Sequence, residues 1–114
     1  MHAEEVVEMQ AFTDKVRVEV SLVDYILDII AATRSSEAIS LGGSPRAAKS
    51  LYRAAQAFAL LEGYDYVLPR HIKELAVPVL AHRLLLKGVE SGPATSRRSE
   101  EILRALLEEV TVPL

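Results

Sequence analysis

The stretch Leu41-Gly42-Gly43-Ser44-Pro45-Arg46 marks the start of a helix and places an arginine in its first turn. The two glycines allow a tight turn, Ser44 is a favourable N-cap, and Pro45 suits the first helical position. The helix dipole opposes a cation at this end, so an anion held between Arg46 and the helix terminus would explain the arginine. The alternative, from spacing alone, is a solvated surface arginine that follows a cap.

Composition predicts one helical domain over residues 1–114. Half of the residues are apolar, yet the aromatic ones are only four Tyr and two Phe, with no Trp. A core of Ala, Leu, Val and Ile suits closely packed helices, and this length suffices for a single core. We therefore expect an all-α fold, a small bundle of about four to five helices with short extended segments.

Charge and the absence of cysteine exclude several classes of function. The chain has 13 Lys and Arg against 16 Asp and Glu, a formal net charge of −3, which argues against a general nucleic-acid binder. Without Cys there is no disulfide, no thiolate metal site and no cysteine nucleophile. The sequence has no apolar run approaching the roughly 20 residues that span a bilayer. It also lacks a signal-peptide pattern, so a cytoplasmic protein is expected.

Apolar periodicity predicts the helices around the glycine turn. One helix is expected over residues 45–62, with Gly63 as its stop. Its apolar stripe is Ala47, Leu51, Ala54, Ala55, Phe58 and Leu61. The helix that precedes the turn begins at Ser21, which with Asp24 forms an acidic capping box, and ends near Arg34. Its expected buried face is Leu22, Tyr25, Ile26, Ile29, Ile30 and Thr33.

The rest of the chain is divided by turn-forming residues. A fourth helix starts at Pro69 and runs to about Leu75, and Pro78 is expected to kink or break it. The remaining expectations are a helix over 3–13, an extended stretch over 14–20, a polar loop between Ser36 and the glycines, a flexible loop over 87–96, and a helix over 100–109 capped by Ser96 or Ser99.

Parts of common active sites are missing from the sequence. No Gly-rich loop ends in Gly-Lys-Ser/Thr, and no pair of metal-binding histidines shares a helix face. His71 is expected to be exposed in a first helical turn, and His82 to have a structural or interface role rather than to bind a metal. We therefore expect that this chain alone is not an enzyme and holds no metal. Lys49 and Arg53 lie on the same helix face as Arg46. This face is expected to be either a subunit boundary or a solvated surface.

Three blocks of sequence carry a resemblance to a known family. They are SLVDYI (21–26) leading to ATR (32–34), LGGSPRA (41–47), and GYDYVLP (63–69) with VLAHRL (79–84). In this order and spacing they resemble the C-terminal helical lid of the MoxR-type AAA+ ATPases. The likeness covers nearly the whole chain, including VTVP at 110–113.

The resemblance implies that an ATPase core binds ATP and Mg²⁺ while the lid closes over the nucleotide. Arg46 matches the sensor-2 arginine, which implies a catalytic contact with the γ-phosphate, and Ser44 and Pro45 would position it. Tyr25 would lie near the adenine, or else be a buried core tyrosine. The implied partners are the ATPase core of the same protein, further copies in a ring such as a hexamer, and client proteins that are remodelled.

The chain departs from the family pattern in three places. Tyr64 replaces a basic residue after Gly63, and Arg70 and His71 replace an acidic pair after the proline, which is expected to weaken that helix cap. The ATPase core is missing, which predicts a fragment of a longer ATPase. A free-standing helical interaction module without nucleotide chemistry remains the alternative, whereas helix-turn-helix DNA binding is disfavoured by the net charge.

Overall fold

The computed structural model describes residues 15–36, 39–41, 44–81, 85–86 and 93–113. The predicted helix over 3–13 and His82 lie outside these residues. Within them, four helices and two short strands occur in the order α2 (Val20–Ser35), β1 (Ile39–Leu41), α3 (Pro45–Leu61), α4 (Pro69–Leu80), β2 (Leu85–Leu86) and α5 (Pro93–Glu109). The prediction of a small all-α bundle with short extended segments is confirmed.

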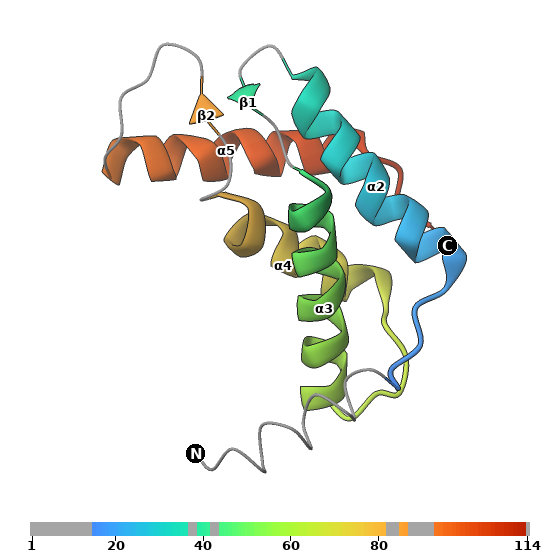
Figure 1. Ribbon diagram of the computed structural model, residues 1–114. Helices are drawn as coiled ribbons and strands as arrows, with labels where there is room; N and C mark the ends of the chain where they lie inside the picture. The colour runs from blue at the N-terminus through green and yellow to red at the C-terminus, as the bar shows by residue number, and fades with distance from the viewer. Residues whose placement is uncertain (1–14, 37–38, 42–43, 82–84, 87–92, 114) are drawn as a thin grey trace.

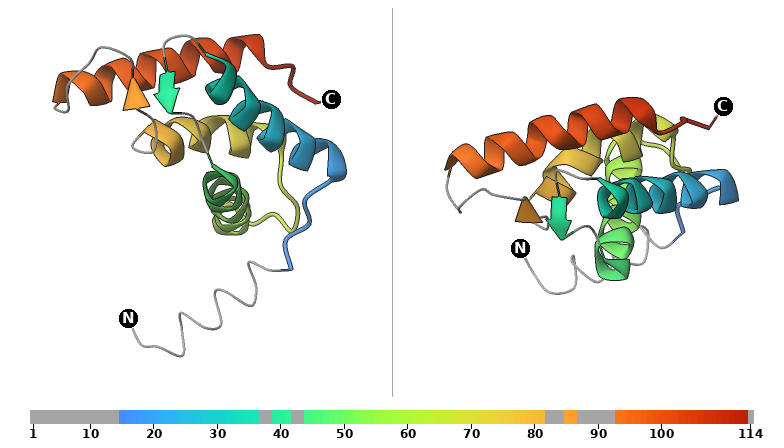
Figure 2. Two further views of the ribbon diagram at one scale, coloured as in Figure 1. Left: turned by 45° about the horizontal axis from the view of Figure 1, so that its top comes forward. Right: turned by 90° about the horizontal axis from the view of Figure 1, so that it is seen from above.

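The helices pack around α4 and α3 rather than side by side in a row (Figure 1). Figure 2 shows α4 between α3 and α5, while α2 contacts both α3 and α5. Strands β1 and β2 pair antiparallel and connect the turn before α3 to the segment after α4. The start of α3 lies beside the C-terminal half of α2 and shortly after β1 in the chain.

One continuous apolar core fills the space between these helices. All six residues predicted for the buried face of α2 are buried, as are Ala47, Leu51 and Ala55 of α3. The prediction that Leu61 belongs to the buried stripe is wrong, because this side chain is 77% exposed at the last position of α3. Ala59 of α3 also belongs to the core. The residues that the rest of the chain contributes are Val16, Ile39, Val67, Ile72, Ala76, Val77, Leu80, Ala81, Leu103 and Leu107. Aliphatic and alanine side chains dominate, which allows the helices to approach closely.

The start of α2 differs from the prediction. The helix begins at Val20 with Glu19 as its N-cap, whose side chain makes no capping hydrogen bond. Ser21 thus lies inside the first turn, and the expected capping box with Asp24 is wrong. The carbonyl of Glu19 accepts from the backbone N–H groups of Leu22 and Val23 at 2.9 and 3.1 Å, so the N-cap lies two residues before the expected Ser21.

The segment that leads into α2 is extended, as its alternating pattern predicts, and it is tied down at two points. Arg17 bridges to Tyr66 in the connection between α3 and α4. Its N–H donates to the Asp65 carbonyl, and its carbonyl accepts from the Val67 N–H, both at 2.9 Å. In addition, the buried Gln56 amide of α3 donates through Nε2 to the Val16 carbonyl at 2.9 Å.

Helix α3 ends where the sequence indicates. Glu62 is its C-cap, and Gly63 follows with φ of +88°, in the left-handed region that favours glycine. The next helix, α4, does not end at Leu75, because it continues through Pro78 to Leu80. Pro78 lies in the last turn and has no backbone N–H, so one helix hydrogen bond is lost. The burial of Val77 and Leu80 in the core offsets the free energy of that lost bond.

Two loop predictions need correction. The expected polar loop after α2 contains strand β1, whose partner β2 is more than 40 residues away in the sequence and leaves no local signal. The expected flexible loop over 87–96 overlaps α5, which begins at Pro93 instead of Glu100. A proline suits a first helical position, so Pro93 is a start signal here. Ser96 and Ser99 are inside the helix rather than caps, and residues 87–92 lie outside the described part.

Candidate functional site

The N-terminus of α3 is capped as the glycine–serine–proline stretch predicts. Ser44 has an extended backbone, with φ of −102° and ψ of 170°. Its Oγ accepts from the Ala47 N–H at 3.2 Å, and its carbonyl accepts from the Ala48 N–H at 3.1 Å. Pro45 occupies the first helical position and has no N–H to satisfy. These contacts fix the backbone of the first turn.

Arg46 is exposed on this fixed turn. Among the described residues, its guanidinium has no hydrogen bond or ion pair, and its backbone N–H has no acceptor. A cation at a helix N-terminus gains nothing from the helix dipole. Arginine and the N–H groups of a first turn can, however, bind an anion together. No group among the described residues competes with such a ligand for Arg46.

A hollow of about 370 Å³ opens beside Pro45, between the C-terminal half of α2 and the start of α3. Its lining is mostly apolar, with Arg34 as the one charged member: Leu27, Ile30, Ala31, Arg34, Ser35, Pro45 and Ala48. Sequence patterns did not reveal it, because the packing of α2 against α3 sets its shape. Leu27 is 52% exposed, although the other leucine and the isoleucines of α2 are buried.

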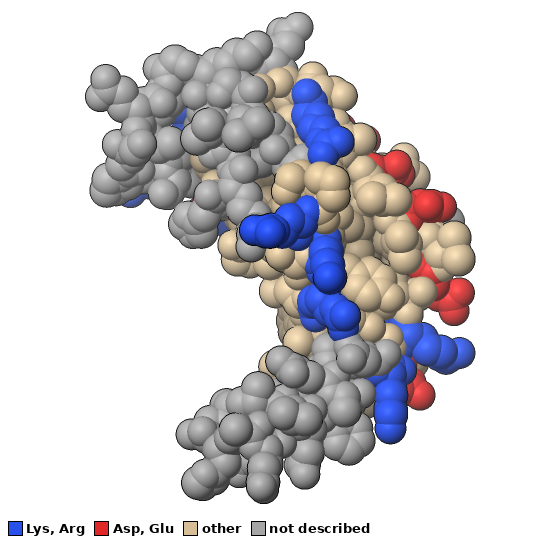
Figure 3. Space-filling view, viewed as in Figure 1, with Lys and Arg blue, Asp and Glu red and all other residues tan. Residues whose placement is uncertain are grey.

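Lys49 and Arg53 continue from Arg46 along α3, and both are exposed. Figure 3 shows Lys and Arg side chains in a line over α3, while Asp and Glu side chains gather along the α2 edge. The shared face predicted for these three residues is therefore present.

Tyr25 lies in the core and is 1% exposed. Its hydroxyl is buried and has no hydrogen-bond partner among the described residues. This burial raises the pKa of Tyr25, with a smaller contribution from the negative charge of Glu108. The interpretation as a core tyrosine fits this position. A base that stacks at the molecular surface has no access to the ring, so Tyr25 is not included in the candidate site.

The opposite end of α3 holds a cluster that sequence reasoning missed. His71 was expected to be exposed but is fully buried, between the rings of Phe58 and Tyr64, with centroid distances of 5.1 and 5.7 Å. Its Nδ1 accepts from the Leu68 N–H at 2.9 Å, which caps α4. Its Nε2 lies 2.6 Å from Glu62 Oε1. The cap of α4 is thus built by His71 itself, and the expectation of a weakened cap is wrong.

Glu62 connects this cluster to solvent. Arg70 donates to both of its carboxylate oxygens, at 2.8 and 3.3 Å. The hydrogen bond from Arg70, helped by the one from His71, lowers the pKa of the Glu62 carboxyl. Because Nδ1 of His71 accepts a backbone N–H, the proton of the neutral ring is on Nε2 and donates to Glu62. Both ring nitrogens are occupied by hydrogen bonds, so the cluster stabilises the turn.

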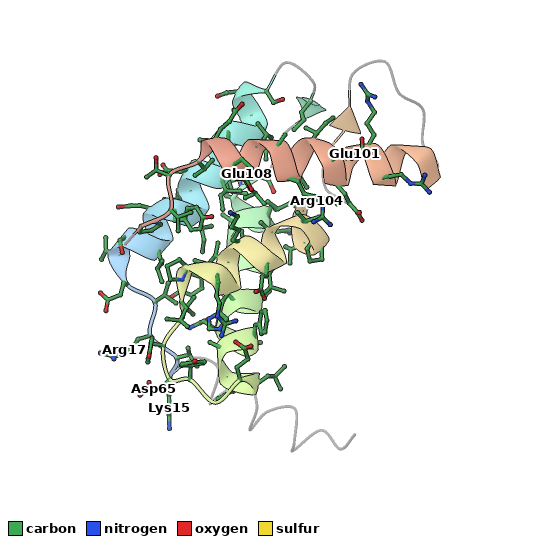
Figure 4. All side chains as sticks on the ribbon, turned by 180° about the vertical axis from the view of Figure 1, so that it is seen from behind. Lys15, Arg17, Asp65, Glu101, Arg104 and Glu108 are labelled. Carbon is green, nitrogen blue, oxygen red and sulfur yellow. The ribbon has the colours of Figure 1, made fainter. Side chains whose placement is uncertain are left out.

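A second hollow, of about 590 Å³, lies between α4 and α5. Its floor is apolar, with Val77, Pro78 and Leu107, and its rim carries both signs of charge. Figure 4 shows Arg104 and Glu108 on α5 at this rim, and Glu108 pairs with Lys73 of α4 at 3.6 Å. Neighbouring charges of opposite sign largely neutralise the rim, so it lacks the cationic character of the α3 terminus.

Metal and membrane sites do not emerge from the described residues. No group of three or more His, Cys, Asp or Glu among them is arranged to hold a metal ion. No helix in the part of the chain that the structure describes combines the length and apolarity needed to cross a membrane.

Comparisons with known proteins agree with the fold. The model of the AAA lid domain matches residues 31–106. The uncharacterized protein YeaC of Bacillus subtilis is 36% identical over 111 residues, which are 97% of this chain and 34% of that protein. Chaperone MoxR1 of Mycobacterium tuberculosis is 33% identical over 102 residues, which are 82% of this chain and 26% of that protein.

A solved structure shows the same arrangement of helices. The crystal structure of a "putative ATPase" from Cytophaga hutchinsonii superposes with a TM-score of 0.81 at 30% identity, covering 97% of this chain and 36% of that one. The chain spans about a third of the length of the proteins it matches. The matched family model, the MoxR relatives and the shared fold together show that this chain belongs to the AAA lid domains, as a lid of the MoxR type.

Proposed function

We propose that this lid senses the nucleotide of a MoxR-like AAA+ ATPase through Arg46, the sensor-2 residue. The observation that carries the proposal is the exposed guanidinium, which has no partner among the described residues and stands on a turn fixed by the Ser44 cap. Contact with a transferring phosphate requires a positive charge that is held in a fixed position. An arginine in the first turn of a rigid helix provides both.

The residues of the turn have distinct tasks in this proposal. ATP supplies the transferable γ-phosphate, and Arg46 would neutralise charge that develops on its oxygens. Ser44 and Pro45 hold the first turn, so that the side chain and the Arg46 N–H approach the anion from the same direction. The donor set of the described lid fits an anion and not a cation, so Mg²⁺ would be held by the ATPase core.

The remaining parts of the proposal concern the assembly. Residues 1–114 would form a single lid domain that works with an ATPase core, in a ring of several copies. One relative is named a chaperone, which suggests that lid movement drives the remodelling of client proteins. The proposed setting is the cytoplasm. Whether Arg46 contacts the nucleotide of its own subunit or of a neighbour is a further outcome of the experiment below.

Replacing Arg46 in an ATPase polypeptide that carries this lid tests the proposal. Arg46→Ala should lower ATP hydrolysis by about 10²-fold or more, the size expected for one lost electrostatic contact to the transferring phosphoryl group. Lys49→Ala, one turn further along the same face, is the matched control and should leave turnover within about twofold. Mixing Arg46→Ala subunits with subunits inactivated in the core would restore turnover only if the arginine acts across the subunit boundary.

Two outcomes would argue against nucleotide sensing. Unchanged turnover in Arg46→Ala rejects the assignment and favours the free-standing interaction module. Tight ATP binding by the 114-residue chain alone would also contradict it, because one arginine without a phosphate-binding loop provides little affinity. We expect only weak NMR shift changes, confined to the turn that contains Ser44 and Arg46.

A further inference from the structure

The exposed side of α2 carries apolar side chains that the core does not cover. Val20 is 76% exposed and Leu27 is 52% exposed, and Val23 between them is half-buried. These residues follow one another at intervals of three and four, and Ile30 continues the series after another three. Such spacing places the four side chains along one stripe of the helix. We call this stripe the α2 seam.

The α2 seam leads into the hollow beside Pro45. Leu27 and Ile30 belong to both, and the hollow measures about 370 Å³. Its other apolar lining comes from Ala31 of α2 and from Pro45 and Ala48 of α3. The hollow is thus a place where a large apolar side chain of a partner can insert next to the seam.

Negative charge flanks the α2 seam on one side. Asp24 and Asp28 are exposed, and neither has a hydrogen bond or an ion pair among the described residues. They are four residues apart, a spacing at which like charges on a helix repel each other. Figure 3 shows acidic side chains along the α2 edge. Exposed apolar side chains beside uncompensated carboxylates indicate a contact surface for a cationic partner.

We propose that the α2 seam docks an α-helix of a partner protein that has apolar residues at intervals of three and four and Lys or Arg at the flanking positions. The partner helix packs along α2, inserts one apolar side chain into the hollow, and pairs its cations with Asp24 and Asp28. This is recognition of a helix by an apolar groove. The proposal extends beyond nucleotide sensing, because it uses neither Arg46 nor a phosphate.

Periodicity and charge select this occupant. The side chains of another helix repeat at the same intervals as the α2 seam, whereas those of an extended strand alternate with a period of two. Cations one helical turn apart match Asp24 and Asp28, which repel a phosphate or a nucleic acid. Exposed ion pairs are individually weak and the apolar area is small, so we expect a dissociation constant on the order of 0.1 mM for a free peptide.

A peptide titration of the 114-residue chain is the first measurement. The probe is a synthetic helical peptide of about 18 residues with Leu at intervals of three and four and Lys at the flanking positions. The same peptide with Glu in place of Lys is its control. The Lys peptide should shift the NMR signals of residues 20–31, and the Glu peptide should bind at least about tenfold more weakly. Equal binding of the two peptides, or shifts confined to α4 and α5, would overturn the proposal.

Two exposed leucines give a matched pair of variants. Leu27→Ser removes the centre of the α2 seam and should weaken binding of the Lys peptide by about tenfold or more. Leu61→Ser changes a leucine that is 77% exposed at the end of α3, outside the seam, and should leave binding within about twofold. Equal losses in the two variants would reject the seam as the binding surface.

Charge reversal tests the choice of partner. Asp24→Lys/Asp28→Lys should invert the preference, so that this variant binds the Glu peptide more tightly than the Lys peptide. Glu101→Lys/Glu109→Lys makes the same change in net charge at exposed positions of α5 and should keep the original preference. An inversion in both variants would show a general effect of net charge and reject the specific contact.

Other occupants of the α2 seam give different results. Sedimentation of the chain without peptide would reveal a second copy as the occupant, if it self-associates and Leu27→Ser abolishes that association. ATP that displaces the Lys peptide would reveal the nucleotide as the occupant. Either result would overturn the proposal. Arg46→Ala should bind the peptide like the unmodified chain, so failure here is distinguishable from failure of nucleotide sensing.

Discussion

The two ends of α3 are built in opposite ways. At the C-terminal end, Glu62, Arg70 and the buried His71 satisfy one another through hydrogen bonds. At the N-terminal end, Ser44 satisfies the backbone, but the guanidinium of Arg46 has no partner among the described residues. Buried polar groups with complete partners stabilise a fold, whereas an exposed charge on a rigid turn is free to bind. The contrast separates residues that the fold needs from residues that a ligand would use.

Removing His71 should have the largest effect on stability. His71→Ala deletes a fully buried ring and leaves the Leu68 N–H without its cap, so the free energy of unfolding should fall by about 3 kcal/mol. His71→Asn keeps an acceptor near the position of Nδ1 and should recover part of the loss. Urea unfolding measures both. Arg46→Ala is the control and should change stability by less than about 0.5 kcal/mol. Similar losses at both ends of α3 would contradict the contrast.

A smaller change is expected at the Ser44 cap. Ser44→Ala should lower the free energy of unfolding by about 1 kcal/mol, because the Ala47 N–H loses its acceptor. Ser44→Asp is informative because aspartate also caps helices and should keep stability. Its carboxylate would, however, stand beside the proposed phosphate contact, so ATP hydrolysis in the ATPase polypeptide should fall. A Ser44→Asp variant that hydrolyses ATP normally would argue against an anion at this turn.

The smallest effect concerns acid stability. Arg70, and to a lesser degree His71, lower the pKa of Glu62 in the folded chain below its ordinary value of 4.5. A carboxyl with a lowered pKa stabilises the fold above the unfolded-state pKa, and this contribution disappears as the pH falls through the folded-state pKa. The stability difference between the unmodified chain and Glu62→Gln should therefore be constant near neutral pH and shrink below about pH 4.5. Unfolding curves over this range measure it, and a difference that grows on acidification would refute the assignment.

Local signals predicted much of this molecule. The buried face of α2, the Ser44 cap and the stop at Gly63 follow from residues within a few positions of one another. Arg46 could likewise be placed at a helix start from its neighbours alone. Its phosphate contact stays a prediction, because the sequence supplies the arginine and the anion belongs to a different domain.

The features that sequence reasoning missed depend on distant partners. His71 was misread because its partner Glu62 is nine residues earlier, across the turn between two helices. Strand β1 forms only because β2 lies beside it, and Gln56 is buried only because it holds the Val16 carbonyl. None of these pairs leaves a periodic pattern. They also explain why the hollow beside Pro45 was not predicted, since it is shaped by the packing of α2 on α3.

The bond between Gln56 and Val16 has a mechanical consequence. Together with the Arg17–Tyr66 bridge, it clamps the leading segment onto α3, near the labelled Arg17 and Asp65 in Figure 4. Gln56 and Arg46 are ten residues apart on one helix, which corresponds to a lever arm of about 15 Å. A displacement of residues 16 and 17 would therefore either break these hydrogen bonds or move α3, and Arg46 stands on that same helix.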